Sequence, residues 1–289
     1  MKLIYKLASY FLIVVLTACM DSKLPKYVEL NSLRILSLMS DKPEVQPANT
    51  ISITPIISDI NETTSLSYEA FGCIDPGVAL GAEPTCANNS TKLSLAQGTI
   101  TSASNSNMAQ NFTGTAPSFS VVIPNDTVMF SQRSEVEKFN GLTYLVEYKL
   151  SNSKGQSVTS VKRILVSNKT RADQNTNPVI SELQSNGAAL GNNDFPTSGK
   201  FGINILFSSE SFQTYTLKKE DGTLQSRTED LTTTWFITDG SLKYFRSTNQ
   251  ESNVFTAPDA ISSSRKSFLI SISRDSRGGV TFKRICGGC

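Results

Sequence analysis

The sequence predicts an all-β protein built from two β-sandwich domains. Short runs in which apolar residues alternate with Ser or Thr recur along the chain, and this is the period of half-buried strands. Gly, Pro and Asn separate these runs, as expected of turns. Outside the N-terminal apolar segment we expect one short helix, at residues 131–139. Strands must therefore supply the layers that bury the core.

The first domain is expected over residues 31–168. Its clearest strand, TISITPIIS, alternates Ile with Ser or Thr. After the charged helix, the runs LTYLVEYKL and VTSVKRILV flank an Asn- and Gly-containing turn, which predicts a β-hairpin. The expected strands are residues 33–38 as an edge strand, followed by residues 50–58, 66–71, 119–123, 142–150 and 158–166.

Two polar segments interrupt this pattern. Residues 86–117 are rich in Asn, Ser and Thr, and predict a long loop insertion that is either ordered by its contacts or functional. Residues 169–177 contain Ala172 as their one apolar residue, and predict an interdomain linker.

The second domain is expected over residues 178–289. It ends in a hairpin of the same type as the first domain, with FLISIS and VTFKRI around the turn at residues 274–279. Trp235 and Phe236 lie in one predicted strand, and we expect both in the core because buried aromatic residues are common in sandwich strands. The expected strands are residues 200–207, 213–218, 232–237, 268–273 and 280–285.

The charge and residue content exclude several function classes. The chain has 27 basic and 25 acidic residues without a clustered basic patch, so we expect no nucleic-acid partner. It has no histidine, which removes Ser-His-Asp and Cys-His nucleophilic systems and His-ligated metal sites. The glycine motifs of phosphate and dinucleotide sites are missing as well. We therefore expect no catalytic residue, no metal site and no cofactor.

The predicted strands resemble bacterial Ig-like and PKD-like extracellular modules. In the first half the resemblance rests on DKPEVQP, ISITPIISDI and LSYEAF. In the second half it rests on Thr234-Trp235-Phe236 and on the run from Ser273 to Gly279. It departs at the 86–117 insertion and in the missing tryptophan of the first domain. The resemblance implies two tandem Ig-like β-sandwich domains used for display, spacing or adhesion.

The N-terminus has the order of a secretory signal. Lys2 and Lys6 precede an apolar run at residues 7–16, which is shorter than the roughly 20 residues that span a bilayer. Leu16-Thr17-Ala18-Cys19 resembles the lipobox of bacterial lipoproteins. The resemblance implies a signal helix at residues 1–18, cleavage before a lipidated Cys19, and a tether at residues 19–30.

The same resemblance implies a location. In Gram-negative lipoproteins, Asp directly after the lipidated cysteine retains the protein at the inner membrane. Here Met20 follows Cys19 and Asp21 comes one residue later. We therefore expect a lipid anchor in the outer membrane, with the inner membrane as the less favoured location. Whether the protein faces the periplasm or the cell surface stays open.

Four cysteines follow Cys19, and an even number in an exported chain favours disulfides. Of the three pairings that exist, Cys73–Cys86 with Cys286–Cys289 is the most economical because each pair is local. The terminal C-x-x-C leaves redox exchange or half a metal site as the alternative reading. Neither a second C-x-x-C nor a histidine is present to complete a zinc site.

These features predict a non-catalytic binding, adhesion or display protein. We expect an unidentified protein or glycan partner to contact the 86–117 segment, since loops on rigid sandwiches carry recognition. The alternatives are an envelope hydrolase with paired carboxylates and a subunit of an envelope assembly. Asp59, Asn61 and Glu62 could supply oxygen ligands for calcium, although such a segment is more often a solvated turn.

Overall fold

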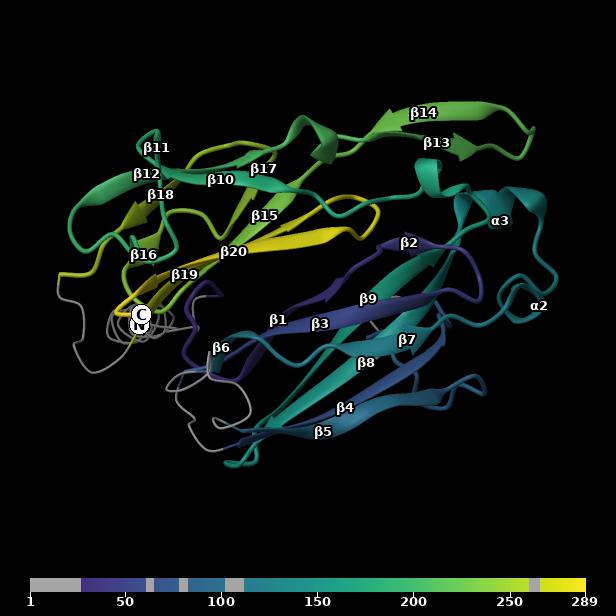
Figure 1. Cartoon of the computed structure of the whole chain (residues 1–289), viewed down its shortest axis with the longest axis horizontal. Helices are drawn as coiled ribbons and strands as arrows, with labels where there is room; N and C mark the ends of the chain where they lie inside the picture. Colours follow the sequence, from purple (N-terminus) through teal and green to yellow (C-terminus); the bar gives the residue numbers. More distant parts are fainter. Residues whose placement is uncertain (1–26, 61–64, 78–82, 102–111, 260–265) are drawn as a thin grey trace, which may run out of the picture.

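The computed structural model describes residues 27–60, 65–77, 83–101, 112–259 and 266–289. These residues confirm the predicted all-β class, and their strands form four stacked layers (Figure 1). The predicted signal helix at residues 1–18 and the predicted lipidation site Cys19 lie outside the described residues. In the part of the chain that is described, no helix is long and apolar enough to cross a membrane.

Lobe 1 contains layers 1 and 2. Its strands are β1 (Arg34–Ser40), β2 (Glu44–Val45), β3 (Thr50–Asp59), β4 (Ser65–Ile74), β5 (Leu93–Thr101), β6 (Phe112–Thr115), β7 (Phe119–Val122), β8 (Leu142–Asn152) and β9 (Ser157–Val166). Layer 1 has the order β2-β9-β8-β4-β5, and layer 2 has the order β1-β3-β6 with β7 also paired to β3. The pairing of β2 with β9 is parallel, whereas the other pairings in this lobe are antiparallel.

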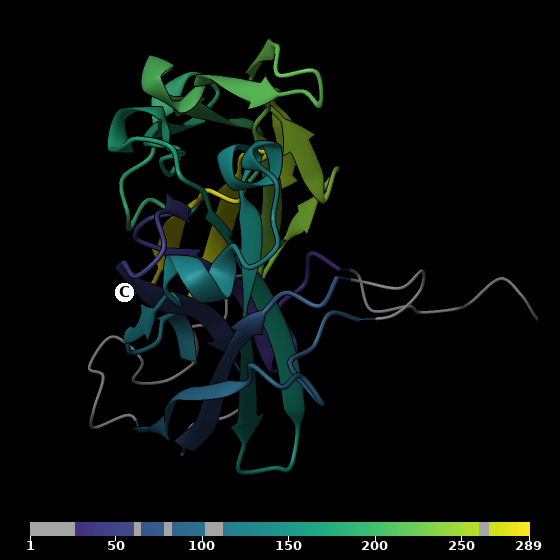
Figure 2. The same cartoon turned by 90° about the vertical axis from the view of Figure 1, so that its right-hand side faces the viewer.

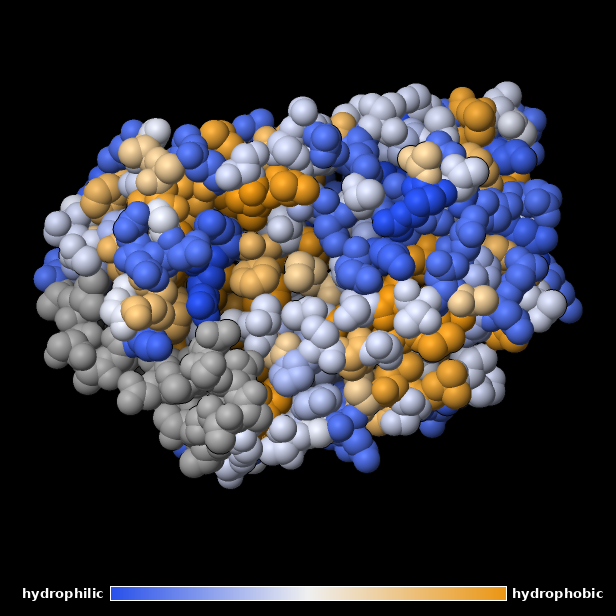
Figure 3. All heavy atoms as spheres, viewed as in Figure 1, coloured by the Kyte–Doolittle hydropathy of each residue, from blue (hydrophilic) through white to orange (hydrophobic). Residues whose placement is uncertain are grey.

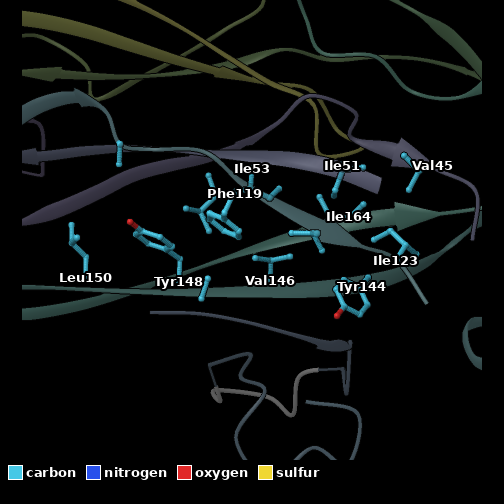
Figure 4. Close-up of a cluster of buried hydrophobic side chains, with 14 of the residues drawn as sticks. Val45, Ile51, Ile53, Phe119, Ile123, Tyr144, Val146, Tyr148, Leu150 and Ile164 are labelled. Carbon is cyan, nitrogen blue, oxygen red and sulfur yellow. The ribbon is translucent and has the colours of Figure 1, made fainter. Parts of the chain in front are cut away.

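The core of lobe 1 lies between these two layers (Figure 4). The alternation predicted for residues 50–58 is present, because Ile51 and Ile53 point into this core. The ring of Tyr148 stacks between Tyr68 and Phe119, with centroid distances of 5.6 and 5.9 Å. Full burial of one large apolar side chain stabilises a fold by about 1.5–3 kcal/mol, so this core holds the two sheets together.

Lobe 2 contains layers 3 and 4 and one separate hairpin. Its strands are β10 (Ile180–Ser185), β11 (Ala188–Ala189), β12 (Lys200–Phe207), β13 (Thr214–Lys218), β14 (Leu224–Thr228), β15 (Thr232–Ile237), β16 (Ser241–Leu242), β17 (Arg246–Thr248), β18 (Asn253–Thr256), β19 (Ser267–Arg274) and β20 (Val280–Gly287). Layer 3 is β17-β15-β19-β20, layer 4 is β11-β10-β12-β18-β16, and β13 pairs with β14 alone. Trp235 lies in the core between layers 3 and 4, as expected, and its indole N–H donates to Ser247 Oγ at 3.0 Å.

A third apolar core joins the two lobes. Along β19, Leu269 faces the core of lobe 2, whereas Phe268, Ile270 and Ile272 face the opposite way. They pack with Leu36 of β1 and with other residues of layers 2 and 3. Layer 2 thus lies against layer 3, and lobe 2 sits directly on lobe 1 (Figure 2). The described lobes are stacked face to face. The sequence predicted two tandem domains joined by a linker and did not predict this stacking.

Two short α-helices precede β8, namely α2 (Asp126–Met129) and α3 (Glu135–Asn140). The helix predicted at residues 131–139 therefore begins later, at Glu135. Ser134 ends the preceding turn, because its hydroxyl accepts from Glu137 N at 3.2 Å while the Glu137 carboxylate accepts from Ser134 N at 2.8 Å. This reciprocal pair is a capping box, which defines a helix start. The 3₁₀ turns are η2 (Arg171–Asp173) and η3 (Ser209–Ser211).

Two segments predicted as loop or tether contain ordered strand-like backbone. Within the 86–117 segment, β5 extends layer 1 and β6 extends layer 2, and residues 102–111 lie outside the described residues. At the predicted tether, Leu30 N donates to Ile237 O at 2.7 Å and Ile237 N donates to Val28 O at 2.8 Å. Residues 27–30 are therefore bound to lobe 2 through β15, with Val28 and Leu30 buried.

Candidate functional site

A buried charged cluster lies at the junction of the two lobes. The turn between β19 and β20, residues 274–279, is called the latch turn below, and it carries Arg277. The Arg277 side chain is 8% exposed, and its Nη1 lies 3.2 Å from Glu44 Oε2. Its Nε donates to the carboxylate of Glu229. One guanidinium from lobe 2 therefore binds a carboxylate of each lobe, and a charge-assisted pair of this kind is strong and directional.

Glu44 is the centre of the cluster on the side of lobe 1. Its side chain is fully buried, and its carboxylate also accepts from Ser167 Oγ at 2.6 Å and from Asn175 N at 2.8 Å. The ammonium of Lys169 lies 3.4 Å from Glu44 Oε1. Two buried cations thus pair with two buried carboxylates. Such pairing offsets the free-energy cost of removing charged groups from water.

The predicted linker at residues 169–177 is part of this cluster. Asn175 is buried, and its side-chain amide donates to Asp275 Oδ2 at 3.0 Å. The Asn177 side chain donates to Ser40 O at 2.6 Å and accepts from Val280 N at 2.8 Å. The segment therefore packs between the lobes and fixes their relative position.

Burial shifts the pKa of Asp275, which lies in the latch turn, and of Lys162, which lies beside it. It raises the pKa of the Asp275 carboxyl, and the negative charge of Glu229 raises it further, while bonds from Asn175 and from backbone N–H groups oppose the shift. Burial lowers the pKa of Lys162 to about 8. The Lys162 ammonium donates to Gly278 O across the lobe junction. Desolvation disfavours the charged form in both groups.

Two hollows border the cluster. One, of about 400 Å³, is lined by Asp173, Gln213 and Tyr215 beside Arg277, whose guanidinium lies 4.2 Å from the Tyr215 ring centroid. The other, of about 270 Å³, is lined by Lys162 and Arg274 among others. In the described ranges no three His, Cys, Asp or Glu residues are arranged to hold a metal ion. Because the carboxylates are bound to cations and amides, the cluster is suited to fixing the lobes.

A separate polar groove lies on the outer face of layer 1. It has a volume of about 590 Å³ and is open to solvent. Its polar lining residues are Ser67, Glu69, Gln97, Thr99, Lys149 and Ser151. This set is called the layer 1 groove below. Gln97 and Thr99 belong to the 86–117 segment, so part of the predicted recognition segment forms one wall.

Both favoured disulfides, Cys73–Cys86 and Cys286–Cys289, are formed. The first ties the loop after β4 to layer 1, where Leu145 and both sulfurs are buried together. Glu147 fixes the same loop, because its Oε2 accepts from Cys86 N at 2.8 Å. The second joins buried Cys286, which belongs to the core between the lobes, to exposed Cys289.

The other predicted site lies partly outside the described residues. Asp59 is buried and accepts from Asn152 Nδ2 at 3.1 Å, whereas Asn61 and Glu62 are not described. The charged cluster itself was not predicted. Its one signal in the sequence is the charged turn that includes Arg274, Asp275 and Arg277.

No family model and no curated protein matches this chain. Solved structures give distant similarities. Dimeric latent PorU from Porphyromonas gingivalis is 8% identical, with a TM-score of 0.23, over 93% of this chain and 25% of that one. Red sea bream transglutaminase is 10% identical, with a TM-score of 0.24, over 89% of this chain and 32% of that one.

The native conformation of E. coli alpha-2-macroglobulin is 13% identical, with a TM-score of 0.27, over 90% of this chain and 16% of that one. This chain thus spans about a third or less of each of these proteins. Similarity at this level assigns neither a family nor a function.

Proposed function

We propose that this chain is a lipid-anchored protein of the bacterial outer membrane that acts as a non-catalytic binding or display platform. Cys19 carries the lipid, and the four-layer body presents the layer 1 groove to a protein or glycan partner. The observation that carries the proposal is the face-to-face stacking of the lobes through a third apolar core. Such stacking fixes a recognition surface relative to the segment that leads to the anchor.

The layer 1 groove is the best described candidate for the recognition surface. Its exposed Ser, Thr, Gln, Glu and Lys side chains offer both hydrogen-bond donors and acceptors. They project from paired strands β4, β5 and β8, so their spacing is held by the sheet. The Cys73–Cys86 disulfide and Glu147 fix a loop on the same layer.

The alternative of a hydrolase needs two carboxylates that are free to exchange protons with a substrate. Glu44 and Glu229 come together at Arg277, but each accepts several further hydrogen bonds and each is buried. Their arrangement supports a structural role. This favours the platform over the hydrolase.

Anchoring is tested by expressing the full chain in a Gram-negative host that is fed an alkyne analogue of palmitate. We expect label on the wild-type chain and none on Cys19→Ala, with the wild type in the outer-membrane fraction of a sucrose gradient. Mass spectrometry of the N-terminal peptide identifies the lipid. Equal labelling of both chains, or none in the wild type, refutes the anchor.

Recognition is tested with a photo-crosslinking amino acid placed at Thr99 in the groove or at Gln225 on β14. Both positions are exposed, so Gln225 is a matched control. We expect a discrete adduct from position 99 in intact cells and none from position 225. A deletion of residues 88–115 is a poorer test, because it would remove β5 and β6. Adducts of equal yield at both positions would contradict a role for the groove.

A further inference from the structure

An exposed aromatic and basic patch lies where the chain enters the described fold. Tyr27, Tyr244 and Phe245 are 58%, 48% and 52% exposed. The Tyr27 and Phe245 ring centroids lie 6.1 Å apart. Single exposed apolar side chains are normal on protein surfaces, but exposed aromatic residues in mutual contact mark an interaction surface.

The patch is built rigidly on lobe 2. The Tyr27 ring packs 5.7 Å from Phe236, a buried residue of the core between the lobes. Trp235 N donates to Phe245 O at 3.0 Å, and Asn253 Nδ2 donates to Tyr244 O at 2.7 Å. The turn between β16 and β17 therefore holds Tyr244 and Phe245 in place, and the contact with Phe236 holds Tyr27 beside them.

Each aromatic residue of the patch has a cation beside it. Arg34 lies over the Tyr27 ring, Lys243 over Tyr244 and Arg246 over Phe245, at 5.8, 4.7 and 5.4 Å from the ring centroids. Aromatic rings that pack beside basic groups match the boundary of an anionic bilayer, where rings enter the headgroup region and cations bind phosphate. The composition of the patch favours a lipid surface over a neutral partner.

The length of the preceding chain places this patch near the anchor. Seven residues lie between Cys19 and Tyr27, so eight steps along the chain, at about 3.3–3.6 Å each, reach at most roughly 29 Å. Lys23 and Lys26 lie within this stretch and add positive charge. In Figure 1, β16 lies toward the left end, whereas α3 and the β13–β14 hairpin lie at the right end. Hydrophilic residues gather over α2 and α3 at that right end (Figure 3).

We propose that the patch of Tyr27, Tyr244 and Phe245, with Arg34, Lys243 and Arg246, docks on an anionic phospholipid surface and orients the anchored protein. The orientation rests on the lipidated Cys19 of the proposed function, whereas the affinity of the patch for anionic lipid is its own property. Lipid chains alone hold a protein at the membrane but leave its body free to tumble. A second contact through the patch sets which side faces the bilayer.

The test uses the full processed protein in vesicles of brominated phosphatidylcholine and phosphatidylglycerol. Phe245→Trp introduces a reporter in the patch, and Leu224→Trp introduces one on β14, where Leu224 is 61% exposed. The native Trp235 is buried and supplies an unchanging background. We expect bromine to quench the reporter at position 245 and not the one at position 224. Equal quenching at both positions overturns the proposal.

Charge variants test the electrostatic part. Neutralising Lys243 and Arg246 to Gln weakens the patch contact by about fivefold per cation at low salt. Lys219→Gln on the distant hairpin is the control and leaves quenching unchanged. If neutralising Lys243 and Arg246 leaves the quenching at position 245 unchanged, the proposal is overturned. The proposal is also overturned if the fluorescence of the Trp at position 245 changes without vesicles while light scattering shows dimerisation. A second copy of the chain would then cover the patch.

Lipidation of Cys19 and docking by the patch are measured separately, so that failure of either proposal can be recognised. Vesicle flotation and mass spectrometry of the Cys19 peptide report lipidation, whereas quenching reports the patch. If the protein floats with vesicles but shows no quenching at position 245, the anchor is supported and docking by the patch is refuted. A protein without lipid must still show salt-sensitive quenching at position 245 on phosphatidylglycerol vesicles, and its absence refutes docking by the patch.

Discussion

Arg277→Met tests whether the latch turn holds the lobes together. Methionine keeps much of the side-chain volume but removes the charge that binds both Glu44 and Glu229. Removing one partner of a buried ion pair destabilises a protein by about 3–5 kcal/mol, because the remaining charge stays buried. Lys169 lies 3.4 Å from Glu44 and compensates part of the loss, so we expect about 3–4 kcal/mol.

The assay is reversible unfolding followed by two probes. Fluorescence of Trp235 reports lobe 2, and far-ultraviolet ellipticity reports the strands of both lobes. A loss of 3–4 kcal/mol corresponds to a fall in Tm of roughly 6–16 °C for a chain of this size. Wild-type transitions should coincide for both probes, since the stacked lobes share a core.

Two controls isolate the ion pair. Arg133→Met removes an exposed pair with Glu137, where N and O lie 3.0 Å apart, and should change stability by less than about 1 kcal/mol. Glu229→Gln added to Arg277→Met removes the stranded charge and should recover at least about 1 kcal/mol. If Arg277→Met alone costs less than about 1 kcal/mol, the cluster does not hold the lobes in the way described.

Three further predictions concern the same junction and the disulfides. The folded pKa of Lys162, about 8, lies below its ordinary value of 10.5, so the unfolded chain binds more protons between these values and stability rises with pH. This group adds about 2 kcal/mol between pH 7.5 and 9.5, and Lys162→Met should abolish that rise in urea titrations. Gly279→Ala should destabilise the protein by about 1–3 kcal/mol, because a Cβ at this position would lie 2.1 Å from Asp275 Oδ2 and 3.0 Å from Thr176 O. An unchanged Tm of the variant would contradict this packing. Mild reductant should open Cys286–Cys289 before Cys73–Cys86, since Cys289 is exposed whereas Cys73 and Cys86 are fully buried. Peptide mass mapping after alkylation checks the order, and the reverse order would contradict the prediction.

The strands with a regular period were predictable from the sequence. Residues 50–58 alternate Ile with Ser or Thr, residues 142–150 are rich in apolar and aromatic residues beside a hairpin turn, and both segments form strands. In contrast β5 (LSLAQGTIT) was missed, because Gln97 and Gly98 interrupt its alternation at an exposed edge. Edge strands need few apolar residues, so their pattern is weak.

The stacking of the lobes was not predicted, although β19 carried a signal for it. Phe268, Ile270 and Ile272 form one apolar face of FLISIS, while the buried Ser271 and Ser273 share the other face with Leu269. A strand that is buried along its whole length packs on both of its sides. The charged cluster was harder to predict, because Glu44, Glu229 and Arg277 are far apart in sequence and charged residues are normally exposed.

The stacking determines how far the candidate groove lies from residues 27–30, the described segment that follows the proposed lipidation site. Residues 27–30 bind β15 in layer 3, whereas the layer 1 groove lies on the outer face of the sheet two layers away. Sheets that pack face to face are about 10 Å apart, so roughly 20 Å of packed protein separates the two. A flexible linker would let this distance vary, but buried Asn175 and the latch turn hold it constant. The groove is therefore displaced by the thickness of the sheets from residues 27–30, which lead to the proposed lipidation site, and substitutions that loosen the latch turn should broaden the orientation of the groove before they unfold either lobe.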